Sequence, residues 1–289
     1  MKTLSHIHPT PPKHWVGDGF YVSSMFNYGQ TERNLDPFLL MDYASPQEFT
    51  PNFDHNLRGV GEHPHRGFET VTIAYQGEIE HKDSYGGGGV IGTGGVQWMT
   101  AGAGLMHQEY HSENFSKTGG LFEMVQLWVN LPAKDKMTAP KYQAIDSDDI
   151  PVVDLDDHGI ARIIAGNFNG MQGTASTFSP INLWDIHLNA DGEYDFVVPE
   201  THNLLILILD GTVLVNDDKI ARPNELVSFE KGGDTVKLSA NNDAKILILS
   251  GEPLNEPVVG YGPFVMNTKD EIDTAISDLR SGKFGQIAQ

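Results

Sequence analysis

The feature of this sequence that most constrains its fold is a series of short apolar segments, each ended by Gly, Pro, Asn or Asp. Residues 204–209 form a continuous apolar run, residues 245–250 contain the apolar run 246–249, and residues 123–131 alternate between polar and apolar side chains. Runs of this length between turn residues are typical of β-strands, and many in series indicate a sandwich or a barrel. We therefore predict an all-β protein, with Trp98 and Trp128 in its core.

Only the C-terminal end shows a clear helical pattern. Thr268 and Glu271 have the spacing of a capping box. Apolar residues then recur on one helical face before Gly282, at Ile272, Ala275, Ile276 and Leu279. The pattern predicts a short C-terminal helix on the barrel surface.

Composition excludes several classes of function. The 39 acidic and 19 basic residues give a net charge of −20, whereas a nucleic-acid surface requires basic residues. The chain has no cysteine, so a bound metal would need nitrogen and oxygen ligands. The N-terminus lacks the apolar region of a signal peptide, and no apolar run approaches the roughly 18 residues of a membrane helix. We expect a cytoplasmic protein with no direct nucleic-acid partner and no membrane partner.

Two short segments each place two potential metal ligands two residues apart, His63-Pro64-His65 and His107-Gln108-Glu109. On a β-strand, such residues point to the same face. Two strands whose faces meet would bring three imidazoles and one carboxylate together, which suits a divalent first-row transition metal with open positions for substrate or oxygen. The glycine-rich stretch 86–95 lacks the Gly-Lys-Ser/Thr ending of a phosphate loop and predicts a flexible loop.

The segment between Pro132 and Pro151 indicates a domain break, because it is rich in Pro and Asp and has little apolar pattern. The two sides of this break repeat each other faintly. Residues 77–81 resemble 211–215, and residues 95–100 resemble 224–229. In this alignment the second half has no ligating side chain opposite any of the four potential ligands. The residues at the equivalent positions are Val197, Pro199, Val236 and Leu238.

The spacing around the histidine pairs resembles the two sequence motifs of the cupins. His63-x-His65-x-x-x-Glu69 followed by Gly77 is similar to the first motif, and Gly104-x-x-His107 is similar to the end of the second. Longer strings in the same order resemble the pirin family, so that the resemblance covers nearly the whole chain: residues 63–72, 97–102, 126–131, 251–254 and 262–268.

The resemblance implies a bicupin, with two face-to-face double-stranded β-helix (jelly-roll) barrels and a short C-terminal helix. We expect residues 1–135 to form a metal-binding barrel and residues 136–289 a barrel without metal that ends in the helix. The implied ligands of one Fe(II), or of another first-row divalent metal, are His63, His65, His107 and Glu109. The implied activity is the cleavage of quercetin-like flavonols by dioxygen, in which Glu109 would also accept a proton.

Some alternatives stay open on the sequence alone. Glu69 matches a ligand of many cupins, but the pirin resemblance gives that role to Glu109, so Glu69 either supports the site or pairs with Arg66. His81 and His111 either support the site, as hydrogen-bond partners of the ligands or as pocket lining, or are plain structural residues. The alternative function is a metal-bearing, redox-sensitive regulatory protein that acts through protein–protein contacts.

Overall fold

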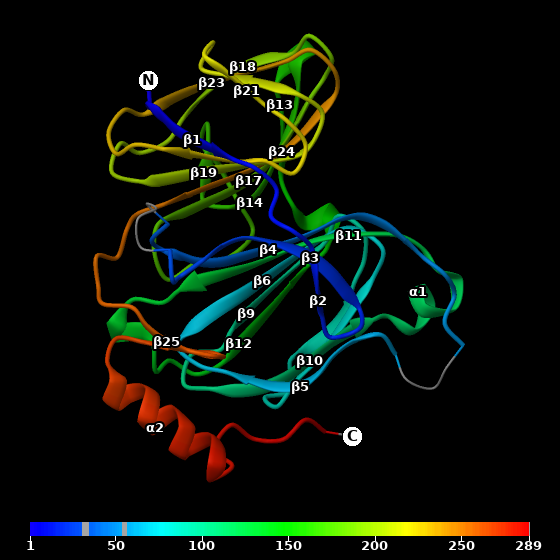
Figure 1. Cartoon of the computed structure of the whole chain (residues 1–289), viewed down its shortest axis with the longest axis vertical. Helices are drawn as coiled ribbons and strands as arrows, with labels where there is room; N and C mark the ends of the chain where they lie inside the picture. The colour runs from blue at the N-terminus through cyan, green and yellow to red at the C-terminus, as the bar shows by residue number, and fades with distance from the viewer. Residues whose placement is uncertain (31–34, 54–56, 289) are drawn as a thin grey trace. The chain divides into compact units, whose positions relative to one another are not determined.

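Antiparallel strands make up nearly all the regular structure of the computed structural model, which describes residues 1–30, 35–53 and 57–288. They form two compact units (Figure 1). The first unit consists of residues 12–28, 38–147 and 255–289. The second unit consists of residues 1–11, 29–37 and 148–254.

The first unit contains a seven-stranded and a four-stranded antiparallel sheet. The larger sheet has the order β12 (Lys141–Ile145), β9 (Val96–Thr100), β6 (Phe68–Gln76), β11 (Gly120–Asn130), β4 (Phe38–Phe49), β3 (Phe20–Asn27) and β2 (His14–Val16). The smaller sheet has the order β5 (Gly59–His65), β10 (Leu105–His111), β7 (Ile79–Asp83) and β8 (Gly88–Ile91).

The second unit repeats this arrangement. Its seven-stranded sheet has the order β1 (Leu4–His8), β22 (Leu226–Phe229), β19 (Asn203–Asp210), β24 (Ala244–Gly251), β17 (Ile181–Leu188), β14 (Gly159–Ala165) and β13 (Val152–Asp154). Its four-stranded sheet has the order β18 (Glu193–Val197), β23 (Thr235–Ala240), β20 (Val213–Val215) and β21 (Lys219–Ala221). The faint sequence repeat therefore has a structural counterpart, in which β23 takes the place of β10.

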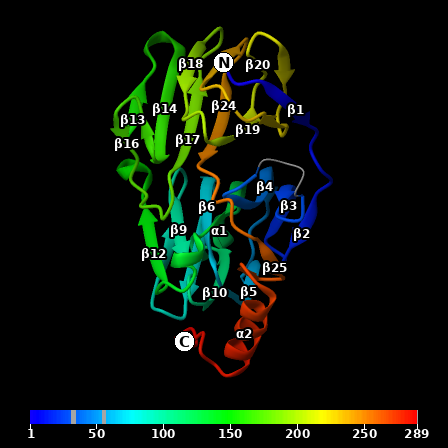
Figure 2. The same ribbon diagram turned by 90° about the vertical axis from the view of Figure 1, so that its left-hand side faces the viewer.

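The limits of the two units differ from the predicted division at residues 135 and 136, because the two chain ends are exchanged. β1 pairs with β22 and so completes the second unit. The C-terminal segment belongs to the first unit, where β25 (Val259–Tyr261) pairs with β26 (Phe264–Met266) and α2 (Lys269–Arg280) lies beside them (Figure 2). The longest segment of the first unit ends at Ser147, where the chain crosses to the second unit at Asp148.

Alternating side chains build the core of each unit. In β17 every second residue, Trp184, Ile186 and Leu188, enters the large core cluster of the second unit. That cluster also contains Val236 and Leu238, two of the residues that stand where the first half has potential ligands. In the first unit, Phe122 and Met124 of β11 belong to an apolar cluster at one end of the inward face.

Two local predictions were incomplete. The glycine-rich stretch contains strand β8, which pairs with β7, and a Cβ at Gly88 would lie only 2.5 Å from the carbonyl oxygen of His81. Glycine is needed there because a second strand passes close by, so the expected flexible loop was wrong for residues 88–91.

A short helix, α1 (Glu113–Thr118), was not predicted. The Ser112 hydroxyl caps it by accepting from the Phe115 amide at 3.0 Å. Two short strands, β15 (Asn167–Phe168) and β16 (Met171–Gln172), complete the second unit.

The C-terminal helix α2 begins with the predicted capping box. The Glu271 amide donates to the Thr268 hydroxyl at 3.3 Å, and the Thr268 amide donates to the Glu271 carboxylate at 2.8 Å. Ile272 and Ala275 are buried on the apolar face. In the described part of the chain, no helix has the length and apolar character required to cross a bilayer.

We predict that Thr268→Ala lowers the free energy of opening of α2 by about 1 kcal/mol, because the Glu271 amide loses its acceptor. Native-state hydrogen exchange of the α2 amides measures this directly. Ser277→Ala, an exposed change in the same helix, is the control and should not lower protection. Unchanged exchange in Thr268→Ala would show that the capping box contributes nothing to the helix.

Candidate metal centre

The register of β10 brings the two predicted ligand pairs together. β10 pairs on one side with β5, where His107 lies opposite His63 and Leu105 lies opposite His65. β5 is the outer strand of its sheet, so Pro64 removes no hydrogen bond from a central ladder. Alternation then turns the side chains of His63, His65 and His107 to the same face.

The three imidazoles converge. Their ring centroids are separated by 4.1 Å between His63 and His107, 4.8 Å between His65 and His107, and 4.9 Å between His63 and His65. One ring nitrogen from each lies within 4.8 Å of the others. His65 and His107 are buried and His63 is half-buried, so the group is reached from the His63 side.

In each of the three rings, the Nδ1 atom has a protein partner. The Nδ1 atom of His63 lies 2.8 Å from the Gly61 carbonyl oxygen, and that of His65 lies 3.4 Å from the Pro263 carbonyl oxygen. His107 directs Nδ1 to His81 at 3.4 Å, while its fully buried Nε2 has no hydrogen-bond partner. A buried nitrogen without a partner is costly, and a metal ion is the group that three converging imidazole nitrogens suit. The residues therefore fit a divalent transition metal.

Burial favours the form of the ligands that binds metal. Desolvation, followed by the neighbouring histidines, holds the pKa of His65 and the pKa of His107 well below the ordinary value for histidine. Both rings are therefore neutral at pH 7, and a neutral imidazole has the lone pair that a metal needs.

Glu109 lies in a second group rather than with His63 and His65. Among the described residues, the ligand atoms of Glu109, His107 and His81 form a group within 4.8 Å, which shares only His107 with the first. One Glu109 oxygen accepts from the Gln97 amide at 2.5 Å, and the other accepts from the Gln126 amide at 3.0 Å. A bulge between His107 and Glu109 breaks the pairing with β5 at this point, which accounts for the separation.

Gln97 and Gln126 were missed by the sequence analysis. Each is a polar residue between two apolar neighbours, in β9 or β11, with its side chain directed to Glu109, and that pattern was the available signal. Trp128, two residues beyond Gln126, was predicted to lie in the core. It is only half-buried, and its ring lies 4.3 Å from that of Phe68 and 5.2 Å from that of His65. Trp128 and Phe68 therefore form an aromatic wall beside His65.

Glu69 does not pair with Arg66. The Arg66 guanidinium pairs with Asp278 of α2 at 2.9 Å, and Glu69 accepts from the Thr100 hydroxyl at 2.7 Å. The turn at Gly67, which has a φ of +88°, separates β5 from β6, so the face of His65 does not continue to Glu69. Thr72 of the same strand bonds to Glu109, which places Glu69 on the opposite face of β6. Desolvation raises the pKa of Glu69 to about 7.

His111 is a core residue rather than a neighbour of the ligands. Its ring lies in the apolar cluster, 4.7 Å from the rings of Phe49 and Phe122, and its Nε2 lies 2.9 Å from the Gly19 carbonyl oxygen. Desolvation lowers its pKa to about 4.

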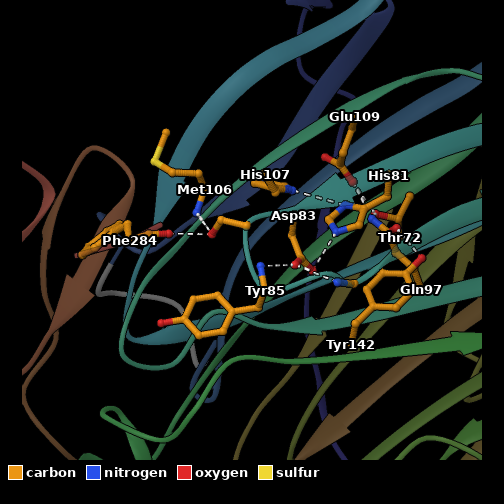
Figure 3. Close-up of polar contacts among 12 residues, drawn as sticks. Thr72, His81, Asp83, Tyr85, Gln97, Met106, His107, Glu109, Tyr142 and Phe284 are labelled. Atoms are coloured by element: carbon orange, nitrogen blue, oxygen red, sulfur yellow. Dashed lines mark hydrogen bonds and ion pairs between the residues drawn. The ribbon is translucent and has the colours of Figure 1, made fainter. Parts of the chain in front are cut away.

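His81 and Asp83 of β7 reach the site from the other side of β10 (Figure 3). His81 is fully buried, contacts His107, and places Nε2 at 3.4 Å from an Asp83 oxygen. Burial raises the pKa of Asp83, but hydrogen bonds from His81 and from the amides of Tyr85 and Gly87 outweigh it, so the pKa lies below its ordinary value. Of the two open readings, His81 is a hydrogen-bond partner of a predicted ligand.

Sequence comparison supplies the relationship of this chain to known proteins. The family profile described as Pirin matches residues 19–129, and that described as Pirin C-terminal cupin domain matches residues 183–285. A Pseudomonas aeruginosa protein, provisionally named a quercetin 2,3-dioxygenase, is 51% identical over 98% of this chain and 99% of its own length. The chain belongs to the pirin family. A pirin-like protein of Caulobacter vibrioides is 38% identical over 93% of this chain and 95% of its own.

Comparison with solved structures shows that this pirin shares the fold of known relatives. A quercetin 2,3-dioxygenase from Acinetobacter baumannii is 53% identical and matches all of both chains with a TM-score of 0.95. A bacterial pirin from Escherichia coli, solved in complex with nickel(II), is 18% identical and covers 86% of this chain and 100% of its own, with a TM-score of 0.66. The predicted all-β bicupin fold with a C-terminal helix is confirmed.

We predict that protein free of a histidine tag binds one transition metal ion per chain. His107→Ala should reduce the bound metal to a small fraction of one ion per chain, because an Nε2 ligand is lost. Elemental analysis after dialysis against Ni²⁺ or Co²⁺ measures the stoichiometry. His6→Ala, an exposed histidine of the second unit, is the matched control. Two ions per chain, or a full complement in His107→Ala, would contradict the predicted ligand set.

His111 should make the first unit sensitive to acid. A pKa of about 4 in the folded state, against about 6.5 in the unfolded chain, means that protonation favours unfolding as the pH falls below 6.5. Between pH 7 and pH 5 this linkage removes roughly 2 kcal/mol of stability. His111→Phe should lose correspondingly less stability over this range in urea unfolding. An equal loss in both proteins would show that His111 does not titrate in this way.

Proposed function

We propose that this pirin is a dioxygenase that cleaves quercetin-like flavonols with dioxygen and uses one divalent metal, Fe(II). His63, His65 and His107 would hold the metal together with Glu109, whose carboxylate joins the three imidazoles through its position beside His107. The observation that carries the proposal is the convergence of three imidazoles, each with Nδ1 engaged by the protein, around the unpartnered Nε2 of His107. The names of its Pseudomonas and Acinetobacter relatives support the reaction.

The chemistry divides between the metal and the chain. Bound Fe(II) would lower the pKa of the flavonol hydroxyl and supply the redox centre for dioxygen. Glu109 is the residue that takes up the hydroxyl proton, because its carboxylate is buried beside His107 and carboxylates act as general bases. Gln97 and Gln126 hold both of its oxygens, and so keep the carboxylate in one orientation.

The surroundings of the histidines suit a planar phenolic substrate. Trp128 lies half-buried next to His65 and packs on the fully buried ring of Phe68, and an accessible aromatic ring stacks favourably on flat rings.

Anaerobic loading with Fe(II), followed by air and quercetin, tests the proposal. We expect loss of flavonol absorbance with matching oxygen uptake, and we expect Glu109→Gln to lower kcat by roughly 100-fold or more, because the base is lost while an oxygen remains. Glu113→Gln, an exposed carboxylate on α1, is the control and should retain full turnover.

Two results would contradict the proposal. Full turnover by metal-loaded Glu109→Gln would refute the proton-accepting role of Glu109. Loaded wild-type protein that consumes neither flavonol nor oxygen would refute the dioxygenase function and favour the regulatory alternative, in which a protein partner reads the metal site.

A further inference from the structure

Backbone hydrogen bonds fix the orientation of the Asp83 carboxylate next to His81. One Asp83 oxygen accepts from the backbone amides of Tyr85 at 2.8 Å and Gly87 at 2.9 Å. The other oxygen faces His81 Nε2 at 3.4 Å (Figure 3). A Cβ at Gly87 would collide with this second oxygen, so the turn after β7 closes around the carboxylate.

The His81 ring is fixed as well. It is fully buried, and the Tyr142 ring stacks on it with a centroid separation of 4.9 Å and an angle of 10° between the planes. Its Nδ1 lies 3.4 Å from Nδ1 of His107. Two ring nitrogens can share a hydrogen bond only if one carries a proton and the other does not.

The acceptor at one end therefore determines the proton position at the other. An ionised carboxylate only accepts, so His81 must donate from Nε2 to Asp83. Its Nδ1 then has no proton and must accept from Nδ1–H of His107. A neutral His107 with its proton on Nδ1 has a free lone pair on Nε2, the buried atom that has no protein partner.

We propose that Asp83 and His81 are positioning residues that fix the tautomer of His107, so that its Nε2 is the atom offered to the metal. This inference rests on the metal site of the proposed function and assigns neither residue as a ligand. Asp83, His81 and His107 form a chain of three groups in which a change at the carboxylate reverses the proton positions at both rings. Partners of this kind typically change metal affinity by about 10- to 100-fold.

Asp83→Asn tests the chain with an isosteric change. The backbone amides of Tyr85 and Gly87 retain the oxygen of the new amide as their acceptor, which turns its NH₂ group toward His81. His81 must then carry its proton on Nδ1, and His107 must carry its proton on Nε2, where it blocks the metal. We expect the affinity for Ni²⁺, measured by chelator competition, to fall by about 10- to 100-fold.

Glu80→Gln is the matched control. It removes one negative charge from the same strand, but its side chain pairs with Lys82 on the opposite face of β7. Its affinity for Ni²⁺ should stay within about threefold of wild type, since only long-range electrostatics change. An equal loss in both variants would show that charge alone is responsible and would overturn the proposal.

Testing Asp83→Asn in a His81→Gln protein distinguishes control of the His107 tautomer from a purely structural role of Asp83. In His81→Gln the side-chain amide can rotate to present its oxygen to Nδ1–H of His107 whatever residue occupies position 83. Adding Asp83→Asn to this variant should therefore cost less than about threefold in Ni²⁺ affinity, a coupling that a double-mutant cycle measures. The same large loss in both backgrounds would overturn the proposal.

The metal-free wild-type protein gives a test that needs no variant. Long-range ¹⁵N–¹H correlation of the imidazoles should show His107 protonated on Nδ1 and His81 protonated on Nε2. His107 protonated on Nε2 would overturn the proposal. Wild-type protein that binds no Ni²⁺ but has the expected tautomers would instead refute the proposed metal-dependent function and leave the assigned proton positions standing.

Discussion

The register of β10 between β5 and β7 is the constraint on which the rest of the site depends. On one side it sets His107 opposite His63, and on the other it sets His107 opposite Asp83 and Glu109 opposite His81. Because side chains alternate along a strand, a slip of one residue would turn His107 and Glu109 away from all of these partners. The predicted ligands and the groups that contact them are therefore fixed by one set of backbone hydrogen bonds.

The inward side of β10 also shows how polar and apolar groups share one interior. His111 at one end lies among phenylalanine rings, whereas His107 and Glu109 lie among glutamine, threonine and histidine side chains. Buried polar groups are tolerated where they are hydrogen-bonded, and nearly every polar atom around Glu109 is satisfied in this way. Among the described side chains of β10, the Nε2 atom of His107 is the one buried polar atom without a hydrogen-bond partner, which is why it is informative about function.

The sequence predicted the parts of the structure that depend on local patterns. Alternation and apolar runs located strands such as β11, β19 and β24, the capping box located α2, and the two histidine-containing pairs located the convergence of His63, His65 and His107. The rest depends on pairings distant in the sequence. The role of Asp83 follows from the pairing of β7 with β10, the exchange of chain ends from the pairing of β1 with β22, and β8 from glycines that carry no apolar pattern.

The exchange of chain ends has a consequence for how the protein is made. The first unit takes Asp278 as the partner of Arg66 and the Pro263 carbonyl as the partner of His65, and both come from the last part of the chain. In the second unit the early segment is the one that lacks its partner: β1 is synthesised first, and it stays unpaired until β22 follows much later. The first unit therefore cannot make these two contacts until residues 263–278 have left the ribosome, by which time all of the second unit has been synthesised. The Pro263 contact of His65 is therefore among the last contacts of the histidine cluster to form.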